Sequence, residues 1–309
     1  MSKQTFIGGQ AVIEGVFMRN GEQVALAVRK PDGAISVKSS QQGSITQKYP
    51  FLKVPFIRGT VNLIESLAVG MKALTHSANL SAQSAEEELS PKEMMITMIS
   101  ALFFGIALFV VIPMALTKFL SDLQGAWFSL AEGGVRIVIL LVYIMLMSRM
   151  PDIKRVFQYH GAEHKTISAH EAGEELTVDN ISKYSPLHPR CGTSFIMFVM
   201  VTKIFIFSFI DSQIAWLDIT LRVISLPLVA GIAYEFIRLS GKYANRSRIG
   251  RVLVAPGLWM QKLTTSEPDA RQIEVAIAAT QVALGVPVTV DNVTIEAEDI
   301  VEEVAYNNV

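Results

Sequence analysis

Long stretches without charge occupy the middle of the chain. Residues Met94 to Leu116 contain no charged side chain, and a helix of that length, at about 1.5 Å per residue, crosses a hydrocarbon core of about 30 Å. Three further apolar segments follow, at 127–148, 192–210 and 219–239. Because charges are costly in lipid, we expect Lys203 and Glu235 within these segments to face protein or to reach the membrane surface. The pattern predicts an α-helical membrane protein with a bundle of four transmembrane helices.

The first 90 residues follow a different pattern, in which short apolar runs alternate with turn signals. The runs are 10–19, 23–30 and 34–39. Asn20-Gly21 and Asp32-Gly33 separate them, and glycine supplies the positive φ that tight hairpins need. These features predict a small β-meander. Between Thr60 and Ala78 the apolar positions recur with helical spacing, which predicts an amphipathic helix that lies on the membrane or packs under the meander.

The C-terminal segment carries helix boundary signals. Ser266 is the expected N-cap, Pro268 lies in the expected first turn, and the helix should end before Gly285. We expect a short strand at Val286–Val290 and a solvated acidic tail after it. Together the N- and C-terminal segments predict a small cytoplasmic β-rich or α+β region beneath the bundle.

Composition supports a membrane location. The chain is 50% hydrophobic and 18% charged, against about 25% charged residues in typical soluble domains, and its mean hydropathy is +0.38. The 27 Lys and Arg are balanced by 28 Asp and Glu, so no basic excess favours nucleic acid as a partner. Cys191 is the single cysteine, which excludes an intramolecular disulfide and fits a reducing compartment.

Basic residues predict the orientation in the membrane. Lys and Arg are frequent in the loop 149–193 and after the last apolar segment, whereas Lys118 is the only clear basic residue in the two other loops. Since basic loops remain cytoplasmic, we expect both termini and the 149–193 loop on the cytoplasmic side of the plasma (inner) membrane. The expected domains are a β-meander with its amphipathic helix (1–90), a four-helix region with a histidine-rich loop (91–240), and a helix–strand segment with a tail (241–309).

The 149–193 loop contains the strongest chemical motif. His160, Glu163 and His164 form an H-x-x-E-H pattern, which on a helix places all three side chains on one face. Two imidazoles so placed can bind one metal ion, and the glutamate can then act as a base toward a metal-bound water. The alternative is a pair of interfacial histidines, with Glu163 simply paired to Lys165 or Arg155.

A second cluster supplies further ligands. His188 and Cys191 lie just before the third apolar segment and therefore return to the same membrane surface as His160. We expect His160, His164 and His188 to bind a divalent metal, zinc first and iron or manganese as alternatives. Other possible ligands are Cys191, Glu235, Glu171, Glu174 and Glu175. Cys191 could equally be a small buried residue or a nucleophile, and His76 and His170 have no partner pattern.

Three charged residues stand near apolar sequence in the N-terminal region. They are Glu14, Arg19 and Arg58. They could hold an anionic group of a substrate beside the metal, or they could form internal ion pairs.

The whole chain resembles the YqhQ family of bacterial multi-pass membrane proteins, also called domain of unknown function 1385. The matching stretches are 8–16 with Met18 and Arg19, Val54-Pro55 with Arg58-Gly59, 159–165, 188–195, and 256–259 with Gln261. Members of this family are described as predicted metal-dependent enzymes. The resemblance therefore implies a metal site and leaves the reaction and the substrate open.

Two main hypotheses follow. In the first, the protein is a membrane-embedded hydrolase that acts on a peptide or a lipid-linked amide or ester, with Glu163 as the general base. In the second, it is a non-enzymatic membrane scaffold or assembly factor with a structural metal. A metal-ion transporter is a third reading, which four helices would support only if the protein forms a homo-oligomer.

Overall fold

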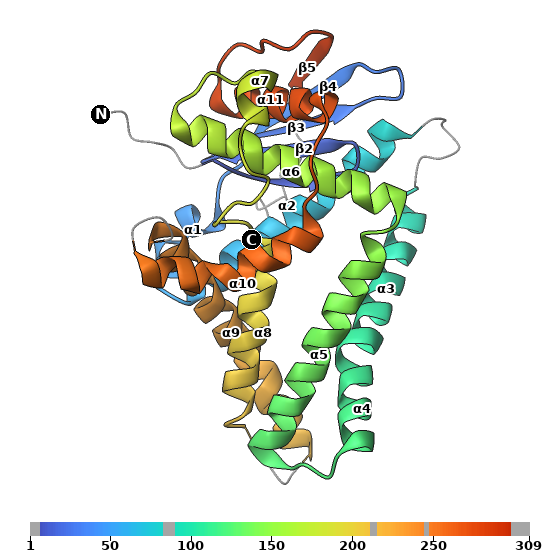
Figure 1. Cartoon of the computed structure of the whole chain (residues 1–309), viewed down its shortest axis with the longest axis vertical. Coiled ribbons are helices and arrows are strands. Elements are labelled where there is room, and N and C mark those ends of the chain that lie inside the picture. Colours follow the sequence, from blue (N-terminus) through green and yellow to red (C-terminus); the bar gives the residue numbers. More distant parts are fainter. Residues whose placement is uncertain (1–6, 83–89, 211–214, 244–246, 298–309) are drawn as a thin grey trace.

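Strands gather at one end of the molecule and long apolar helices at the other (Figure 1). The computed structural model describes residues 7–82, 90–210, 215–243 and 247–297. We call the strands with the helices packed on them the head, and the long apolar helices the stem. The acidic residues predicted to form a tail lie outside the described part of the chain, except Glu296, which belongs to the last strand.

The head contains one five-stranded sheet in the order β1-β2-β3-β4-β5. Its strands are β1 (Gly8–Val12), β2 (Gly15–Asn20), β3 (Gln23–Arg29), β4 (Ile35–Gln41) and β5 (Val293–Ala297). The first four form an antiparallel meander, and β5 pairs parallel to β4. Gly21 and Gly33 adopt positive φ, so the two predicted hairpin turns are confirmed.

Two sequence predictions about strands were wrong. Segment 10–19 is two strands, because the chain turns at Ile13-Glu14, where Glu14 adopts a φ of 50°. The last strand is not at Val286–Val290. There the Gln281 side chain accepts from the N–H of Thr289 at 3.0 Å and donates to its hydroxyl at 2.9 Å. This N–H is therefore satisfied without a strand partner, and the chain pairs with β4 only from Val293.

Helices cover both faces of the sheet. The predicted amphipathic helix is α2 (Ile57–Ser81), and its Val69 and Ala73 pack on one face against Val12, Phe17 and Leu26. The other face packs against α6 (Pro151–Ala172) and α11 (Ala270–Leu284). The N-cap of α11 is Asp269, three residues later than predicted, because Asp269 and Gln272 form a capping box. Its predicted end at Gly285 is confirmed. Short helices α1 (Ile45–Lys48), η1 (Pro50–Lys53) and α7 (Val178–Ser182) complete the head.

The stem contains the apolar helices. Its elements are α3 (Pro91–Ile106), η2 (Ala107–Val111), α4 (Ile112–Leu120), α5 (Gly125–Met147), α8 (Thr193–Phe207) and α9 (Ala215–Tyr243). Three helical stretches are long and apolar enough to cross a membrane, namely Lys92–Leu120, Gly125–Met147 and Thr220–Leu239. Helix α8 is also apolar, but its 15 residues extend only about 22 Å. Three of the four predicted spans are thus helices that could cross a membrane by length and composition.

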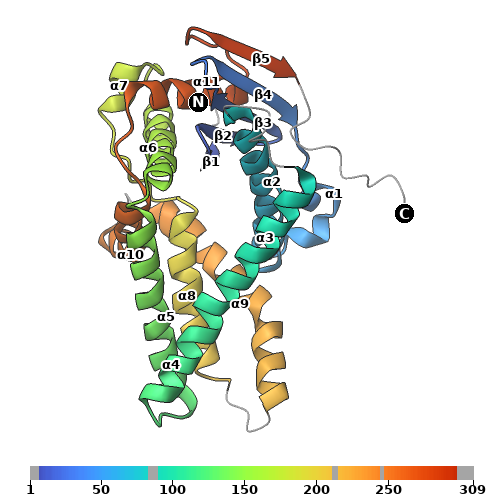
Figure 2. The same ribbon diagram turned by 90° about the vertical axis from the view of Figure 1, so that its right-hand side faces the viewer.

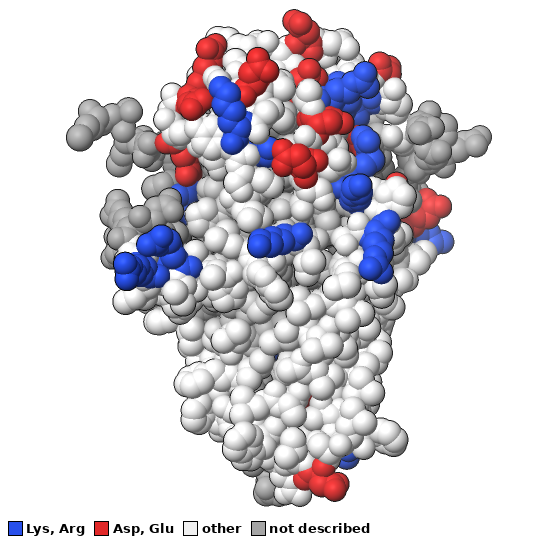
Figure 3. All heavy atoms as spheres, viewed as in Figure 1, with Lys and Arg blue, Asp and Glu red and all other residues white. Residues whose placement is uncertain are grey.

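Helix α10 (Arg248–Thr264) joins the stem to the head and was not predicted. It lies across the top of the stem rather than along it (Figure 1). Lys and Arg side chains stand around this junction, and the stem surface below them is almost free of charge in the same view (Figure 3). The junction therefore separates a charged half of the molecule from an apolar one.

Candidate metal centre

Helix α6 carries the H-x-x-E-H motif into the interior of the head. It begins with Pro151 at its first turn and ends at Gly173, which adopts the left-handed conformation. The turns between them pack on the sheet and on α11, so the motif is buried. His160 is 9% exposed, Glu163 4% and His164 1%. The three side chains share one face, as their spacing predicts.

Backbone carbonyls orient both imidazoles. His160 donates from Nδ1 to the carbonyl of Thr264 at 2.8 Å, and His164 donates from Nδ1 to the carbonyl of Pro186 at 2.6 Å. A carbonyl can only accept, so each Nδ1 carries a proton, and in a neutral ring Nε2 then keeps its lone pair. Metal-binding histidines are commonly oriented in this way by a hydrogen bond from the second ring nitrogen.

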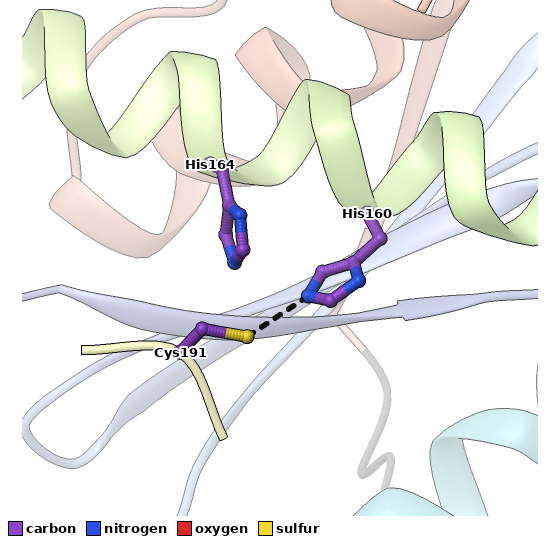
Figure 4. Close-up of side chains that lie close together, drawn as sticks. All are labelled: His160, His164 and Cys191. Carbon is purple, nitrogen blue, oxygen red and sulfur yellow. Dashed lines mark hydrogen bonds between the residues drawn. The ribbon is translucent and has the colours of Figure 1, made fainter. Parts of the chain in front are cut away.

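Cys191 completes a group of three donors. It lies in the loop before α8, and its Sγ is 3.2 Å from Nε2 of His160 (Figure 4). One ligand atom from each of His160, His164 and Cys191 lies within 4.8 Å of the others. Figure 4 shows both rings on α6 directed toward the sulfur. Two imidazole nitrogens and a thiol are a donor set that suits zinc.

Helix α10 supports the loop that carries Cys191. The Gln261 side chain accepts from the N–H of His188 and donates to its carbonyl, both at 2.9 Å, and also reaches the hydroxyl of Ser194 at 3.0 Å. Gln261 is fully buried. Sequence reasoning assigned no role to Gln261 or to the two carbonyls. A carbonyl leaves no trace in a sequence pattern, and Gln261 lies on a helix that was not predicted.

The predicted ligand His188 lies beside this group rather than in it. Its ring centroid is 5.7 Å from that of His164. Its Nδ1 accepts from the N–H of Arg190 at 3.4 Å, and its Nε2 is 3.7 Å from the carboxylate of Glu171. Glu171 also pairs with Arg190. The structure therefore places Cys191 with the two motif histidines, and His188 next to them.

Glu163 is a buried carboxyl group that has no salt bridge with Lys or Arg in the described part of the chain. Its Oε2 has no hydrogen-bond partner among the described residues. Lys165 pairs with Glu267, and Arg155 pairs with Glu14, so neither of the two expected cations is paired with Glu163. Burial raises the pKa of Glu163 to about 8, and nearby His160 opposes this increase. An unsatisfied buried carboxylate is costly, so its presence here points to a functional role.

Burial favours the neutral forms of His164, His188 and Cys191. Burial lowers the pKa of His164 well below its ordinary value and that of His188 to about 4. Burial also raises the pKa of the Cys191 thiol. Neutral imidazoles are the form that binds metals, and a cation would favour the thiolate and the carboxylate. The donor set and the unsatisfied Oε2 of Glu163 therefore fit a divalent ion.

The predicted residues Glu14, Arg19, Arg58 and Glu235 form ion pairs in different places. Arg58 makes a bidentate ion pair with Glu235 at 2.6 and 2.7 Å. Both carboxylate oxygens of Glu235, a possible metal ligand, are therefore bound by Arg58. Arg19 is 3.6 Å from Glu65. Glu14 pairs with Arg155 and accepts from the hydroxyl of Tyr159 at 3.2 Å. Glu174 accepts from Tyr184 at 3.0 Å. The structure thus shows ion pairs for Glu14, Arg19 and Arg58, with three different partners.

Comparisons with known proteins identify relatives of this chain. Residues 54–286 match the family described as "Protein of unknown function (DUF1385)". The Bacillus subtilis (strain 168) protein named "Uncharacterized protein YqhQ" is 35% identical over 285 residues, which cover 87% of this chain and 89% of that protein. No solved structure matches the chain. With a match over more than half of its length and a relative of this similarity, the chain belongs to the DUF1385 family.

Proposed function

We propose that the protein is a membrane-embedded, metal-dependent hydrolase whose site faces the cytoplasm. One observation supports this proposal most strongly. The Oε2 atom of the buried Glu163 carboxylate has no hydrogen-bond partner among the described residues. This carboxylate interacts electrostatically with His160 and Cys191, two of the three candidate ligands. A ligand set beside an unpaired carboxylate is the arrangement that water-activating metal sites use.

Each residue has a separate role in this proposal. His160, His164 and Cys191 would hold the ion, with Nε2 of both histidines presented by the carbonyls of Thr264 and Pro186. His188, whose ring lies next to that of His164, is a possible further ligand. Zinc is the best match to a thiol and two imidazoles, and iron or manganese is the alternative. A bound divalent ion would polarise a substrate carbonyl and increase the acidity of water.

Glu163 is the general base. Opposite charge favours the ionised carboxylate, so beside a cation its pKa falls below the value of about 8 that burial alone gives. The ionised carboxylate then accepts a proton from the attacking water and returns it to the leaving group. The substrate in this proposal is a peptide or a lipid-linked amide or ester.

Burial supports a second candidate, a structural metal site in a membrane scaffold or assembly factor. His164 is 1% exposed, Cys191 6% and Glu163 4%. Closed structural zinc sites have four protein ligands, and Glu163 would have to move toward the group of three to be the fourth. In that case the ion fixes the loop before α8 against α6 and has no free position for a substrate.

The membrane arrangement follows from the two halves of the molecule. We infer that α8, although short, packs with α5 and α9 as a fourth membrane helix. The Lys and Arg side chains at the junction on the face shown in Figure 3 support a cytoplasmic head with both termini on that side. The bilayer is then a permanent partner, nucleic acid is not expected to be one, and a homo-oligomer is compatible with the exposed stem.

Metal analysis tests the proposal. We expect detergent-purified protein to contain about one zinc per chain by elemental mass spectrometry, and the His160→Ala/His164→Ala variant to lose it. His170→Ala is the matched control, because His170 is on the same helix outside the ligand group. Absence of metal from the wild-type protein, even after dialysis against zinc, would overturn the proposal.

Glu163→Gln separates the two candidates. A general base is not a ligand, so the hydrolase predicts that this variant keeps its zinc and loses turnover. The structural site predicts that the variant binds zinc more weakly, because one of four ligands has lost its charge. Zinc content measured across a chelator titration distinguishes these results.

A further inference from the structure

Strand β1 leaves one side of its backbone open. It is an edge strand, and the pair Val12 and Gly15 closes its two-residue hairpin with β2. In such a ladder alternate residues, here Gln10 and Gly8, direct their N–H and C=O groups at β2. Gly9 and Ala11 therefore direct theirs outward, and within the described part of the chain no hydrogen bond reaches these outward groups. The outer side of β1 offers a row of free donors and acceptors.

Glu163 lies against this edge. A Cβ built on Gly9 would be 3.2 Å from Oε1 of Glu163 and 2.7 Å from Sδ of Met18. Glycine thus keeps open the space between the strand and the carboxylate. Figure 2 shows β1 as the strand nearest the stem, so the open edge faces the membrane side of the head. A further strand would lie about 4.8 Å from β1, which brings its backbone close to Glu163.

A cavity of about 400 Å³ lies on the other face of the same edge. Strands β1 and β2 line it with Gly8, Gln10, Phe17 and Arg19, and helix α2 lines it with Ser66 and Val69. Successive side chains of a strand point to opposite faces. In a strand paired with β1, one set of side chains would enter this cavity, and the other set would point toward Glu163.

We propose that an extended polypeptide segment binds by adding a strand to the outer side of β1. Main-chain hydrogen bonds to Gly9 and Ala11 hold the segment, and the cavity selects its side chains. Binding follows from the edge alone, whereas cleavage of the segment rests on the proposed hydrolase function. In that reaction water adds across one amide C–N bond, so that the carbonyl carbon gains the hydroxyl, the nitrogen gains the proton, and a carboxylic acid and an amine are released.

A chemically modified peptide tests the hydrogen bonds without altering the protein fold. A degenerate library of ten-residue peptides is selected on full-length, zinc-loaded Glu163→Gln protein in detergent, and retained peptides are resynthesised with N-methyl groups on alternate residues. We expect one alternate set to weaken binding about tenfold, because one set faces β1 and loses its donors, and the other set to change it less than about twofold. Equal effects of both sets, or no retained peptide, would overturn the proposal.

Two substitutions of Ala11 test the protein side. Ala11→Pro removes the outward N–H without removing a bond to β2, and proline is tolerated on edge strands. We expect it to weaken binding of the selected peptides about tenfold. Ala11→Ser keeps the N–H and is the matched control, with binding within about twofold of the parent. Thermal unfolding and zinc content show that both variants are folded. Unchanged binding by folded Ala11→Pro would contradict the proposal.

The outcomes also separate this inference from the proposed function. If peptides bind at β1 but zinc-loaded wild-type protein does not cleave them, the edge site stands and the hydrolase proposal fails for peptides. If the protein cleaves a lipid-linked ester and retains no peptide, the hydrolase proposal stands and the edge site is wrong.

Discussion

The head and the stem contain similar apolar residues in opposite environments. In the head, Met18, Leu26 and Tyr159 are fully buried by the chain itself. In the stem, Phe103 is 68% exposed and Phe119 is 86% exposed, and none of the most apolar window of Lys92–Leu120 is buried. The head thus builds its own core, while the stem relies on lipid to cover its side chains. Packing defects should therefore be costly in the head and mild in the stem.

Polar groups show the same contrast. In the stem the buried charges Glu132 and Arg136 pair with each other at i,i+4. In the head, Glu163 is buried with no cation paired to it among the residues described. A membrane region neutralises its charges because lipid cannot solvate them. A buried carboxyl group in the head that has no paired cation among the described residues instead marks the place where the fold has kept a reactive group.

The largest expected effect in the head comes from Gly161→Ala. The added Cβ would be 2.1 Å from the backbone carbonyl oxygen of Ser266, and the N–H of Ser266 is bonded to the carbonyl of Phe157 at 2.9 Å. Neither backbone can move freely, so we expect a loss of about 3 kcal/mol in the free energy of unfolding despite the better helix propensity of alanine. Thermal unfolding in detergent measures this loss.

Gly192→Ala is the control for that substitution. Gly192 lies in the loop at the candidate metal centre with nothing within 4 Å of its added Cβ, and its φ is −62°. We expect a change of less than about 0.5 kcal/mol. Equal losses in the two variants would mean that the contact with Ser266 is not what makes glycine necessary at position 161.

The second-largest expected effect is the change with pH in the free energy of unfolding of chelator-treated protein. Burial raises the pKa of Glu163 from 4.5 to about 8. Above pH 6.5 the folded chain keeps a proton that the unfolded chain has released, so stability falls as the pH rises from 6.5 to 8, by about 2 kcal/mol. Below pH 6.5 the lowered pKa values of His164 and His188 act in the opposite direction, because the unfolded chain then binds more protons.

Glu163→Gln provides the comparison for the pH measurement. It removes the titrating carboxyl group, so we expect the fall in unfolding temperature between pH 6.5 and 8 to disappear. A fall of the same size in wild type and variant would assign the titration to another group. A constant wild-type value would mean that water reaches Glu163 and that the head is less closed than its buried side chains indicate.

The elements that the sequence predicted well are those with local signals. The turns at Gly21 and Gly33 need positive φ, the span from Met94 has no charge, and the end of α11 has a glycine. The turn at Glu14 was missed because positive φ there is imposed by the hairpin and no glycine marks it. The last strand was misplaced because its partner β4 is about 250 residues away in the chain, and periodicity does not show such pairing.

The sequence predicted which residues of α6 belong to the candidate site, but not which residue of the following loop joins them. His160, Glu163 and His164 share a face because the helical period is fixed. The choice between His188 and Cys191 depends on how the 173–192 loop returns to the helix, and Gln261 on α10 sets this return. Tertiary contacts between residues 73 positions apart decide which of the two lies with His160 and His164, so the sequence could nominate both residues without ranking them.

The smallest expected effects come from alanine substitutions of two adjacent glycines of α5, in the stem. A Cβ on Gly133 would be 2.2 Å from the Ile204 side chain, which can rotate, while a Cβ on Gly134 would meet nothing within 4 Å. We expect Gly133→Ala to cost about 1 kcal/mol and Gly134→Ala to stabilise the protein by up to about 1 kcal/mol through helix propensity. Thermal unfolding in detergent should therefore rank the losses as Gly161, Gly133, Gly134. If Gly134→Ala destabilises the protein as much as Gly161→Ala, the stem is packed against another protein chain at this surface, and lipid is not what covers it.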